Sequence, residues 1–212
     1  MNFKYIFWDN DGVLVDTEHL YYQANREAMA KVNFNLTHRT FVDMSLTHGR
    51  KILDLVEDMK LSSNQKIALR DWRNKRYMEL LCDGELVLPE VRKVLCHLHG
   101  NFGMAVVTTS RRDHFDAIHR NSGLLQFFDF VLTREDYLHA KPNPEPYLLA
   151  LANSKVPKDK CLVIEDSPRG LTAAKAAGLA CWIVPSKDTS GQSFAGADRI
   201  LGSVSELLSV LM

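Results

Sequence analysis

The sequence predicts an α/β fold, a doubly wound, Rossmann-like parallel sheet into which a small all-helical segment is inserted. Three observations lead to this prediction. Apolar runs of four or five residues recur along the chain, and segments with apolar residues at helical spacing separate them. Such alternation is typical of doubly wound sheets. In addition, about 85 residues separate the first apolar run from the second, whereas a crossover between parallel strands needs only about a dozen.

The apolar runs are expected to be strands, because near-continuous hydrophobic runs of this length are typical of strands buried on both faces of a parallel sheet. Five runs are clear, and a weaker sixth is expected to be an edge strand. In chain order they are residues 5–8, 104–107, 128–132, 161–164, 180–184 and, at the edge, 199–201.

Three helices are expected between the later strands, over residues 89–99, 144–152 and 168–177. Each begins with a proline, which suits the first turn of a helix. Gly178 stands where a glycine often ends a helix.

The long gap between the first two strands also reads as helix. Apolar residues recur at intervals of three and four over residues 18–32, 47–59 and 62–81. We therefore interpret residues 17–86 as a helical cap domain inserted into a core domain of residues 1–16 and 87–212, with hinges near residues 15–17 and 84–89.

Composition limits the possible partners. Lys plus Arg and Asp plus Glu both number 26, so the formal net charge is zero, which argues against broad binding to nucleic acid. No run approaches the ~18–20 apolar residues of a membrane span, and carboxylates appear at residue 9, before a signal peptide could form. We expect a soluble, cytoplasmic protein that does not bind membranes and is a monomer or a small homo-oligomer.

The four cysteines contain no Cys-x-x-Cys pair. A zinc site is therefore not expected, and reduced thiols suit a cytoplasmic protein.

Polar residues with related chemistry follow the predicted strands. Ligands of open α/β sheets bind beyond the carboxyl ends of the strands, so these residues should converge. Their acidic oxygens suit Mg²⁺, while a lysine and a hydroxyl beside them would stabilise a phosphoryl group. They are Asp9, Asp11, Thr108, Thr109, Lys141, Glu165 and Asp166.

Four segments in order resemble the motifs of the haloacid dehalogenase-like hydrolase superfamily. Residues 9–18 read DNDGVLVDTE, Thr108 ends the second strand, residues 141–147 read KPNPEPY, and residues 165–170 read EDSPRG. The chain is similar to the phosphatase and β-phosphoglucomutase-like subgroup, which carries a small helical cap. Together the motifs span nearly the whole expected core domain.

The resemblance implies catalytic roles. Asp9 would attack the phosphorus and form an aspartyl phosphate. Asp11 would protonate the leaving oxygen and then act as a base towards water. Thr108 would donate a hydrogen bond to the phosphoryl oxygens, and Lys141 would pair with Asp9 and the phosphoryl group. The structural alternatives are a strand-end or helix-capping role for the aspartates and the threonine, and a solvated surface position for the lysine.

The resemblance also implies binding roles. Thr109, through its backbone N–H, and Ser110 would join Thr108 and Lys141 at the phosphoryl group. The Mg²⁺ ligands would be Asp9, Asp11 through its backbone carbonyl, Asp166, and Glu165 either directly or through water.

Within this superfamily, Asp11 favours phosphoryl transfer, because dehalogenases lack the second aspartate. A mutase like β-phosphoglucomutase has a histidine where this chain has Tyr21, and residues 45–50 align poorly with its cap turn. We therefore favour a phosphatase for a small sugar phosphate or a similar phosphomonoester, with the sugar phosphomutase as the main alternative. A phosphonate- or halide-cleaving variant, or a silent binding protein, is the remaining possibility.

Further residues are candidates for substrate contact, although packing or solvent exposure explains them equally well. Ser110, Arg111 and Arg112 would suit a second anionic group of the substrate. The candidates in the insert are Tyr21, Tyr22, Asn25, His48, Arg50, Trp72 and Arg76.

Overall fold

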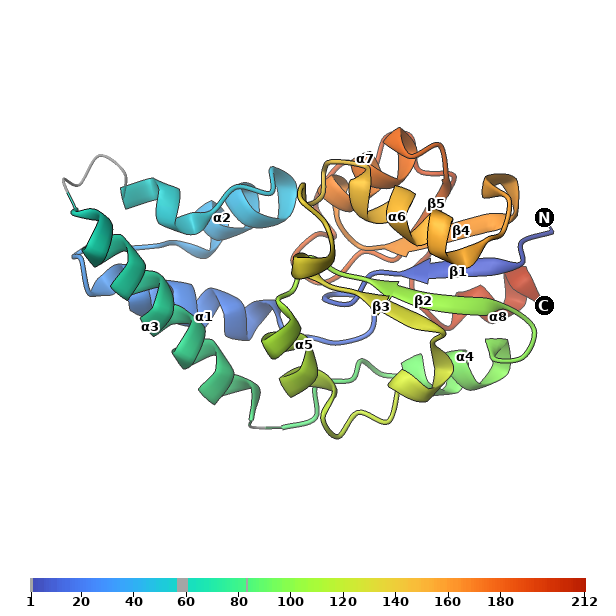
Figure 1. Ribbon diagram of the computed structural model, residues 1–212, viewed down its shortest axis with the longest axis horizontal. Helices are drawn as coiled ribbons and strands as arrows, with labels where there is room; N and C mark the ends of the chain where they lie inside the picture. The colour runs from blue at the N-terminus through green and yellow to red at the C-terminus, as the bar shows by residue number, and fades with distance from the viewer. Residues whose placement is uncertain (1, 57–60, 83) are drawn as a thin grey trace.

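The computed structural model describes residues 2–56, 61–82 and 84–212, and its centre is a parallel sheet (Figure 1). The strands lie in the order β3-β2-β1-β4-β5-β6, so the direction of winding reverses between β1 and β4. A doubly wound sheet binds its ligand at such a switch point. The strands are β1 (Tyr5–Trp8), β2 (Gly103–Val107), β3 (Phe130–Leu132), β4 (Cys161–Glu165), β5 (Ala180–Ile183) and β6 (Arg199–Ile200).

Successive side chains of the central strands point alternately into two apolar cores, one on each face of the sheet. Ile6 and Trp8 of β1 point into one core, whereas Tyr5 and Phe7 point into the other. Helices cover both faces, as a parallel sheet requires. The first core receives α4 (Val91–Leu98), α5 (Arg112–His119) and α8 (Glu206–Leu211), and the second receives α6 (Glu145–Ser154) and α7 (Pro168–Ala176). Short 3-10 turns lie at η3 (Leu125–Phe127), η4 (Arg134–Asp136) and η5 (Lys158–Lys160).

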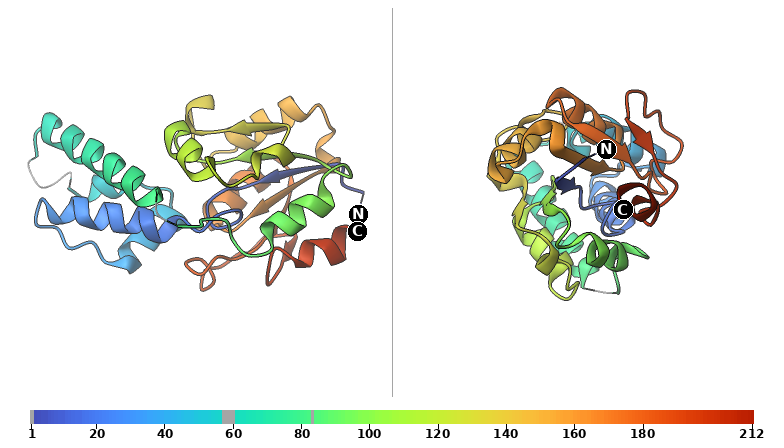
Figure 2. Two further views of the ribbon diagram at one scale, coloured as in Figure 1. Left: turned by 90° about the horizontal axis from the view of Figure 1, so that it is seen from below. Right: turned by 90° about the vertical axis from the view of Figure 1, so that its right-hand side faces the viewer.

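Residues 18–81, between β1 and α4, are mostly helical and lie beyond the carboxyl ends of the strands, away from both chain termini (Figures 1 and 2). We call residues 18–81 the helical insert. It has its own apolar core, which includes Met29, Phe41 and Leu69. Its elements are α1 (Glu18–Ala30), α2 (His38–Phe41), the π-helical turn η1 (Val42–Thr47), the 3-10 turn η2 (Ile52–Val56) and α3 (Ser63–Leu81).

The chain enters and leaves the insert along two adjacent segments. The backbone N–H of Asp16 donates to the Leu86 carbonyl at 2.8 Å, and that of Leu88 donates to the Leu14 carbonyl at 3.0 Å. Val15 and Val87 form an antiparallel bridge between these two bonds. The insert is therefore connected to the sheet through one paired crossing.

The predicted fold class is confirmed, and all six predicted strands are present to within two residues. The single helix predicted over residues 47–59 is wrong in its described part, because residues 48–51 are irregular and only the 3-10 turn η2 follows them. Gly49 has φ +65°, which ends helical geometry there, and residues 57–59 lie outside the described residues. The helix predicted from Pro89 begins at Val91, because Glu90 adopts φ +64°.

Two expectations about the whole chain can be compared with the structure. All four cysteines are free thiols: Cys82 and Cys96 are exposed, whereas Cys161 and Cys181 are buried. None of the helices in the described residues combines the length and the apolar composition that crossing a bilayer would take.

Candidate active site

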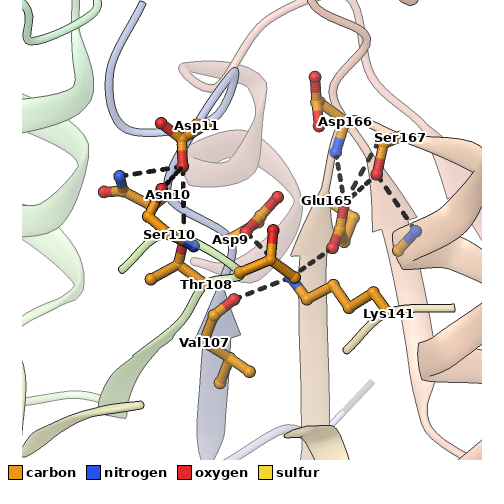
Figure 3. Close-up of polar contacts among 12 residues, drawn as sticks. Asp9, Asn10, Asp11, Val107, Thr108, Ser110, Lys141, Glu165, Asp166 and Ser167 are labelled. Carbon is orange, nitrogen blue, oxygen red and sulfur yellow. Dashed lines mark hydrogen bonds and ion pairs between the residues drawn. The ribbon is translucent and has the colours of Figure 1, made fainter. Parts of the chain in front are cut away.

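Lys141 lies at the centre of the polar side chains that follow β1, β2 and β4 (Figure 3). Its Nζ donates to Asp9 Oδ1 at 2.9 Å, to Glu165 Oε1 at 2.7 Å and to the Val107 carbonyl at 2.8 Å. An ammonium group has three N–H donors, and all three are used. Lys141 is almost completely buried, and its three hydrogen bonds connect the carboxyl ends of β1, β2 and β4.

Glu165 is the most fully hydrogen-bonded carboxylate of the group. Tyr147 donates to Oε1 at 2.8 Å beside Lys141, while Oε2 accepts from the backbone N–H groups of Asp166 and Ser167 and from the Ser167 hydroxyl. Burial alone would raise the pKa of Glu165, but Lys141 and Tyr147 outweigh it and lower the pKa. Glu165 is thus an ionised anchor for the lysine.

Asp9, Glu165 and Asp166 form a buried acidic cluster. Each offers one oxygen atom, and the three atoms lie within 4.8 Å of one another. Burial, followed by the charge of Glu165, raises the pKa of Asp9 to about 7 even though Lys141 opposes the change. Burial and the same neighbouring charges raise the pKa of Asp166 well above its usual range. Burial and the neighbouring carboxylates therefore disfavour full ionisation of this cluster.

Asp11 is held by hydroxyl groups instead of by the lysine. Ser110 Oγ donates to Asp11 Oδ2 at 2.8 Å and Thr108 Oγ1 donates to it at 3.3 Å, while Thr17 donates to Oδ1. The backbone N–H of Ser110 in turn donates to Thr108 Oγ1 at 3.0 Å. Asp11 is half-buried, so its carboxylate has a fixed orientation and still reaches the surface of the site.

Two glycines in the motifs allow the backbone to approach these carboxylates. Gly12 has φ +81°, and a Cβ there would lie 2.2 Å from Asp166 Oδ2. A Cβ at Gly170 would lie 1.9 Å from the carboxyl group of Glu165. Any larger residue at either position would displace a carboxylate of the acidic cluster.

A cavity of about 810 Å³ lies between the helical insert and the strand tips, a size typical of small-molecule sites. Asp11, Thr109 and Ser110 line it from the sheet side, while Tyr21 and Arg50 line it from the insert. The edge of the sheet that carries Asp11, Thr109 and Ser110, which we call the catalytic edge for its proposed role, therefore opens into this cavity.

Some residues that the sequence offered for substrate contact do not line this cavity in the described part of the chain. Each has a partner elsewhere, so packing or surface pairing accounts for its position. Tyr22 donates to the Leu36 carbonyl, Asn25 to the Tyr21 carbonyl, His48 contacts the Asp43 carbonyl, Trp72 packs beneath Lys31, Arg76 pairs with Glu27, and Arg112 pairs with Asp136. Arg111, in contrast, does line the cavity.

The comparison with protein families decides the identity of this arrangement. A model of the haloacid dehalogenase-like hydrolases matches residues 3–178. The chain belongs to the haloacid dehalogenase-like hydrolase family. The predicted family is thereby confirmed, and the chain is an enzyme of this hydrolase class.

Relatives of this haloacid dehalogenase-like hydrolase align with it over most of both chains. Protein CbbY of Cereibacter sphaeroides is 30% identical, over 95% of this chain and 93% of its own. A protein of Thermotoga maritima described as a phosphorylated carbohydrates phosphatase is 32% identical, over 82% of this chain and 81% of its own. The crystal structure of CbbY from Rhodobacter sphaeroides in complex with phosphate superposes with a TM-score of 0.84 at 27% identity, covering 97% of this chain and 96% of that chain.

The structure brings the predicted site residues of this hydrolase into two adjoining groups. Asp9, Lys141, Glu165 and Asp166 form one, and Asp11, Thr108 and Ser110 form the other. The Thr109 hydroxyl instead accepts a hydrogen bond from Arg169 at 3.3 Å.

Sequence reasoning missed several supporting residues of the hydrolase site. Tyr147, Ser167 and Thr17 each bind one of its carboxylates, and Arg169 lines the cavity. Tyr147, Ser167 and Arg169 stand inside the third and fourth motifs, so their position in the motif was the available signal.

His119 connects the first motif to α5. Its Nε2 lies 2.7 Å from Asn10 Oδ1, and its Nδ1 lies 2.9 Å from Ser122 Oγ. These contacts suit a neutral imidazole that donates to the amide oxygen and accepts from the hydroxyl. Burial lowers the pKa of His119 to about 4.

We expect His119 to make the protein less stable in mild acid. Its pKa is lower in the folded state than the ordinary value of about 6.5, so the unfolded state binds more protons between these values. The contribution of the neutral His119 to the free energy of unfolding is therefore fully present above pH ~6.5. It is lost as the pH falls towards 4, and the loss between pH 7 and pH 5 is about 2 kcal/mol. Urea unfolding of the wild type and of His119→Gln, measured at both pH values, checks this. An equal decrease in the two proteins would show that His119 contributes nothing.

Proposed function

We propose that this enzyme is a Mg²⁺-dependent phosphatase that hydrolyses a small phosphorylated metabolite, most simply a sugar phosphate, through an aspartyl phosphate on Asp9. The observation that carries the proposal is the buried contact between Lys141 and Asp9, beside Asp166 and beneath the cavity. The phosphatase activity of the Thermotoga maritima relative on phosphorylated carbohydrates supports the substrate class.

The proposed first step forms a bond between Asp9 and phosphorus. The free carboxylate oxygen of Asp9 attacks the phosphoryl group while the bond between phosphorus and the ester oxygen breaks. Lys141 stabilises the charge of the attacking carboxylate and of the phosphoryl oxygens. Thr108 and the nearby backbone N–H groups, including that of Thr109, are assigned to these oxygens.

Asp11 is assigned to the proton transfers. It donates a proton to the leaving ester oxygen in the first step. It then accepts a proton from a water molecule, whose oxygen attacks the aspartyl phosphate and releases inorganic phosphate and free Asp9. The hydroxyls of Ser110 and Thr17 fix the orientation of this carboxylate, as a general acid requires.

The residues present fit a magnesium ion. The donors of the acidic cluster are oxygens only, which hard cations prefer. Burial, followed by the charge of Glu165, raises the pKa of both Asp9 and Asp166, and a cation bound between them would favour their ionised forms. Asp9, Asp166 and the Asp11 carbonyl would hold the ion. Glu165 already accepts hydrogen bonds at both oxygens, so it would contribute negative charge beside the ion instead of a direct ligand. When bound, the ion neutralises charge on the phosphoryl oxygens.

We further propose residues 17–86 as the cap domain and residues 1–16 and 87–212 as the core domain. The insert covers the catalytic edge of the sheet, and its Gly49 lies against the backbone of Lys141. A Cβ at Gly49 would be 3.0 Å from the Lys141 carbonyl oxygen. A cap in this position excludes bulk water and admits small substrates.

The deciding experiment measures both possible products. We expect purified enzyme with Mg²⁺ and a panel of sugar phosphates to release inorganic phosphate, detected colorimetrically, while nuclear magnetic resonance finds no isomerised sugar phosphate. Isomerisation without phosphate release would instead identify a phosphomutase. The expectation follows from Tyr21, which occupies the position of the mutase histidine and accepts a hydrogen bond from Arg73.

Chelation should stop this activity reversibly. We expect excess ethylenediaminetetraacetate to reduce the rate to background and added Mg²⁺ to restore it, because the acidic cluster would otherwise repel an anionic substrate. The same treatment should leave the circular dichroism spectrum unchanged, since the strands are held together by backbone pairing and by apolar cores on both faces of the sheet. An undiminished rate in chelator would exclude the metal role.

A further inference from the structure

The cavity above the catalytic edge is lined by an excess of positive charge. Among the residues that the structure describes, eight basic side chains and four carboxylates line it, although the whole chain has no formal net charge. A single phosphoryl group beside Lys141 does not account for this excess. We call the five basic residues that the helical insert contributes the basic wall; they are Arg50, Lys51, Lys66, Arg70 and Arg73.

Arg73 differs from the rest of the basic wall because the protein fixes its position. Its Nη1 donates to Tyr21 Oη at 2.7 Å and to Asn25 Oδ1 at 3.1 Å, and its Nε donates to Asn74 Oδ1 at 2.9 Å. The guanidinium carbon lies 5.0 Å from the centre of the Tyr21 ring. Asn25 is itself completely buried. These contacts orient the guanidinium within the cavity.

The partners of Arg73 leave its charge and two of its donors available. All three hydrogen-bond acceptors are uncharged, and no carboxylate of the described residues lies within 4.0 Å of Arg73. A guanidinium has five N–H donors, of which three are used. Nη2 donates to no acceptor in the described part of the chain. A half-buried, oriented guanidinium with a free edge is a binding group for a carboxylate or a phosphate.

Four of the other cations that line the cavity already have partners, whereas no side-chain hydrogen bond fixes Arg50, Lys51 or Lys66 in the described residues. Arg70 lies 3.6 Å from Asp71, and Arg111 lies 2.7 Å from Asp113. Arg134 donates to two backbone carbonyls. Arg169 lies in the field of Glu18 from the insert, which acts most strongly, and of Asp9, Glu165 and Asp166 from the strand ends. Arg73 is thus the oriented cation best placed to meet an anion from the substrate.

We propose that the substrate carries a second anionic group, a phosphate or a carboxylate, and that Arg73 binds it. The proposal rests on the proposed phosphatase function and narrows its substrate class to phosphometabolites that carry a second anionic group besides the phosphate that is cleaved. Because Asp11, Ser110 and Arg73 line the same cavity, one small molecule can contact the catalytic edge and the basic wall together. The basic wall would add long-range attraction for such a substrate.

The test compares substrates in matched pairs. Fructose 1-phosphate is compared with fructose 1,6-bisphosphate, and glycerol 3-phosphate with 3-phosphoglycerate. We expect the wild type to prefer the member with the second anionic group, and Arg73→Gln to lower kcat/KM for that member by about 10- to 100-fold, the range for a charge-assisted hydrogen bond. The rate on the other member should change less than about threefold.

Arg76→Gln is the matched control, because Arg76 lies on the same helix, pairs with Glu27 and is not among the cavity-lining residues. It should keep the wild-type preference, and Arg73→Lys should keep part of it. Thermal unfolding establishes that each variant is folded. Equal loss on both members of each pair in Arg73→Gln, or no preference in the wild type, would overturn the inference.

If the proposed phosphatase function is wrong, the enzyme will release phosphate from none of these substrates, nor from p-nitrophenyl phosphate. In that event the same pairs are tested by titration calorimetry. Tighter binding of the member with the second anionic group would still support the second-anion site, provided that this preference is lost in Arg73→Gln and kept in Arg76→Gln. Equal affinities for both members would refute it.

Discussion

Asp9→Asn is expected to abolish turnover, by a factor on the order of 10⁴ or more, as removal of a covalent nucleophile does. The amide has nearly the same shape as the carboxylate and its oxygen can still accept from Lys141, but it cannot attack phosphorus. The substitution also removes one charge from a cluster in which burial and Glu165 already raise the pKa of Asp9 to about 7. The free energy of unfolding should therefore not decrease.

Initial rates of phosphate release and urea unfolding measure the two effects. The matched control is Asp16→Asn, because Asp16 stands in the same motif but is exposed and pairs only with His19 in the described structure. The control should retain wild-type rates within a fewfold. Acid quenching of the wild type during turnover should trap phosphate on Asp9, whereas none should be trapped on the Asn variant. Wild-type rates in Asp9→Asn would remove the basis of the mechanism.

Lys141→Met is expected to destabilise the fold and to stop catalysis together. Lys141 is the single ammonium group between Asp9 and Glu165, and both carboxylates are buried. Loss of one partner from a buried ion pair typically costs about 3–5 kcal/mol, because the remaining charge stays buried without compensation. Urea unfolding without Mg²⁺ measures this cost, since a bound ion would mask part of it.

Two further variants separate charge from packing. Lys175→Met breaks a surface pair with Asp198, and should change the free energy of unfolding by less than about 1 kcal/mol. The double variant Lys141→Met with Glu165→Gln should recover part of the lost stability, because one buried charge has gone, but no turnover. If the double variant were less stable than the single one, the assigned cost of unpaired charge would be wrong.

The sequence predicted the strands well because their signal is local. A strand buried on both faces must be apolar at every position, and β1 and β4 show this as uninterrupted runs. The convergence of Asp9, Lys141 and Asp166 could also be predicted, because parallel strands end at one edge of the sheet. The structure of the insert was harder to predict from the sequence, since Gly49 packs closely against the backbone of Lys141, which is more than 90 residues away in the sequence.

The supporting contacts of the site could not be derived from residue types. Whether Glu165 binds a metal or a lysine depends on where Tyr147 and Ser167 lie, and these distances exist only in the folded chain. The position of Arg73 likewise depends on how α1 packs against α3. Periodicity placed Asn25 on the insert without showing that its side chain holds an arginine.

The paired crossing between residues 14–16 and 86–88 has a consequence for the architecture as a whole. No strand of the sheet takes a hydrogen-bonded partner from the helical insert in the described residues, and the chain leaves and returns at one point. The backbone pairing of the sheet therefore does not depend on the length of the chain inserted at that point, although Ala24, Tyr77 and Leu81 of the insert pack into the first apolar core. The architecture is modular in this sense: helical inserts of different lengths are compatible with the same order of strands.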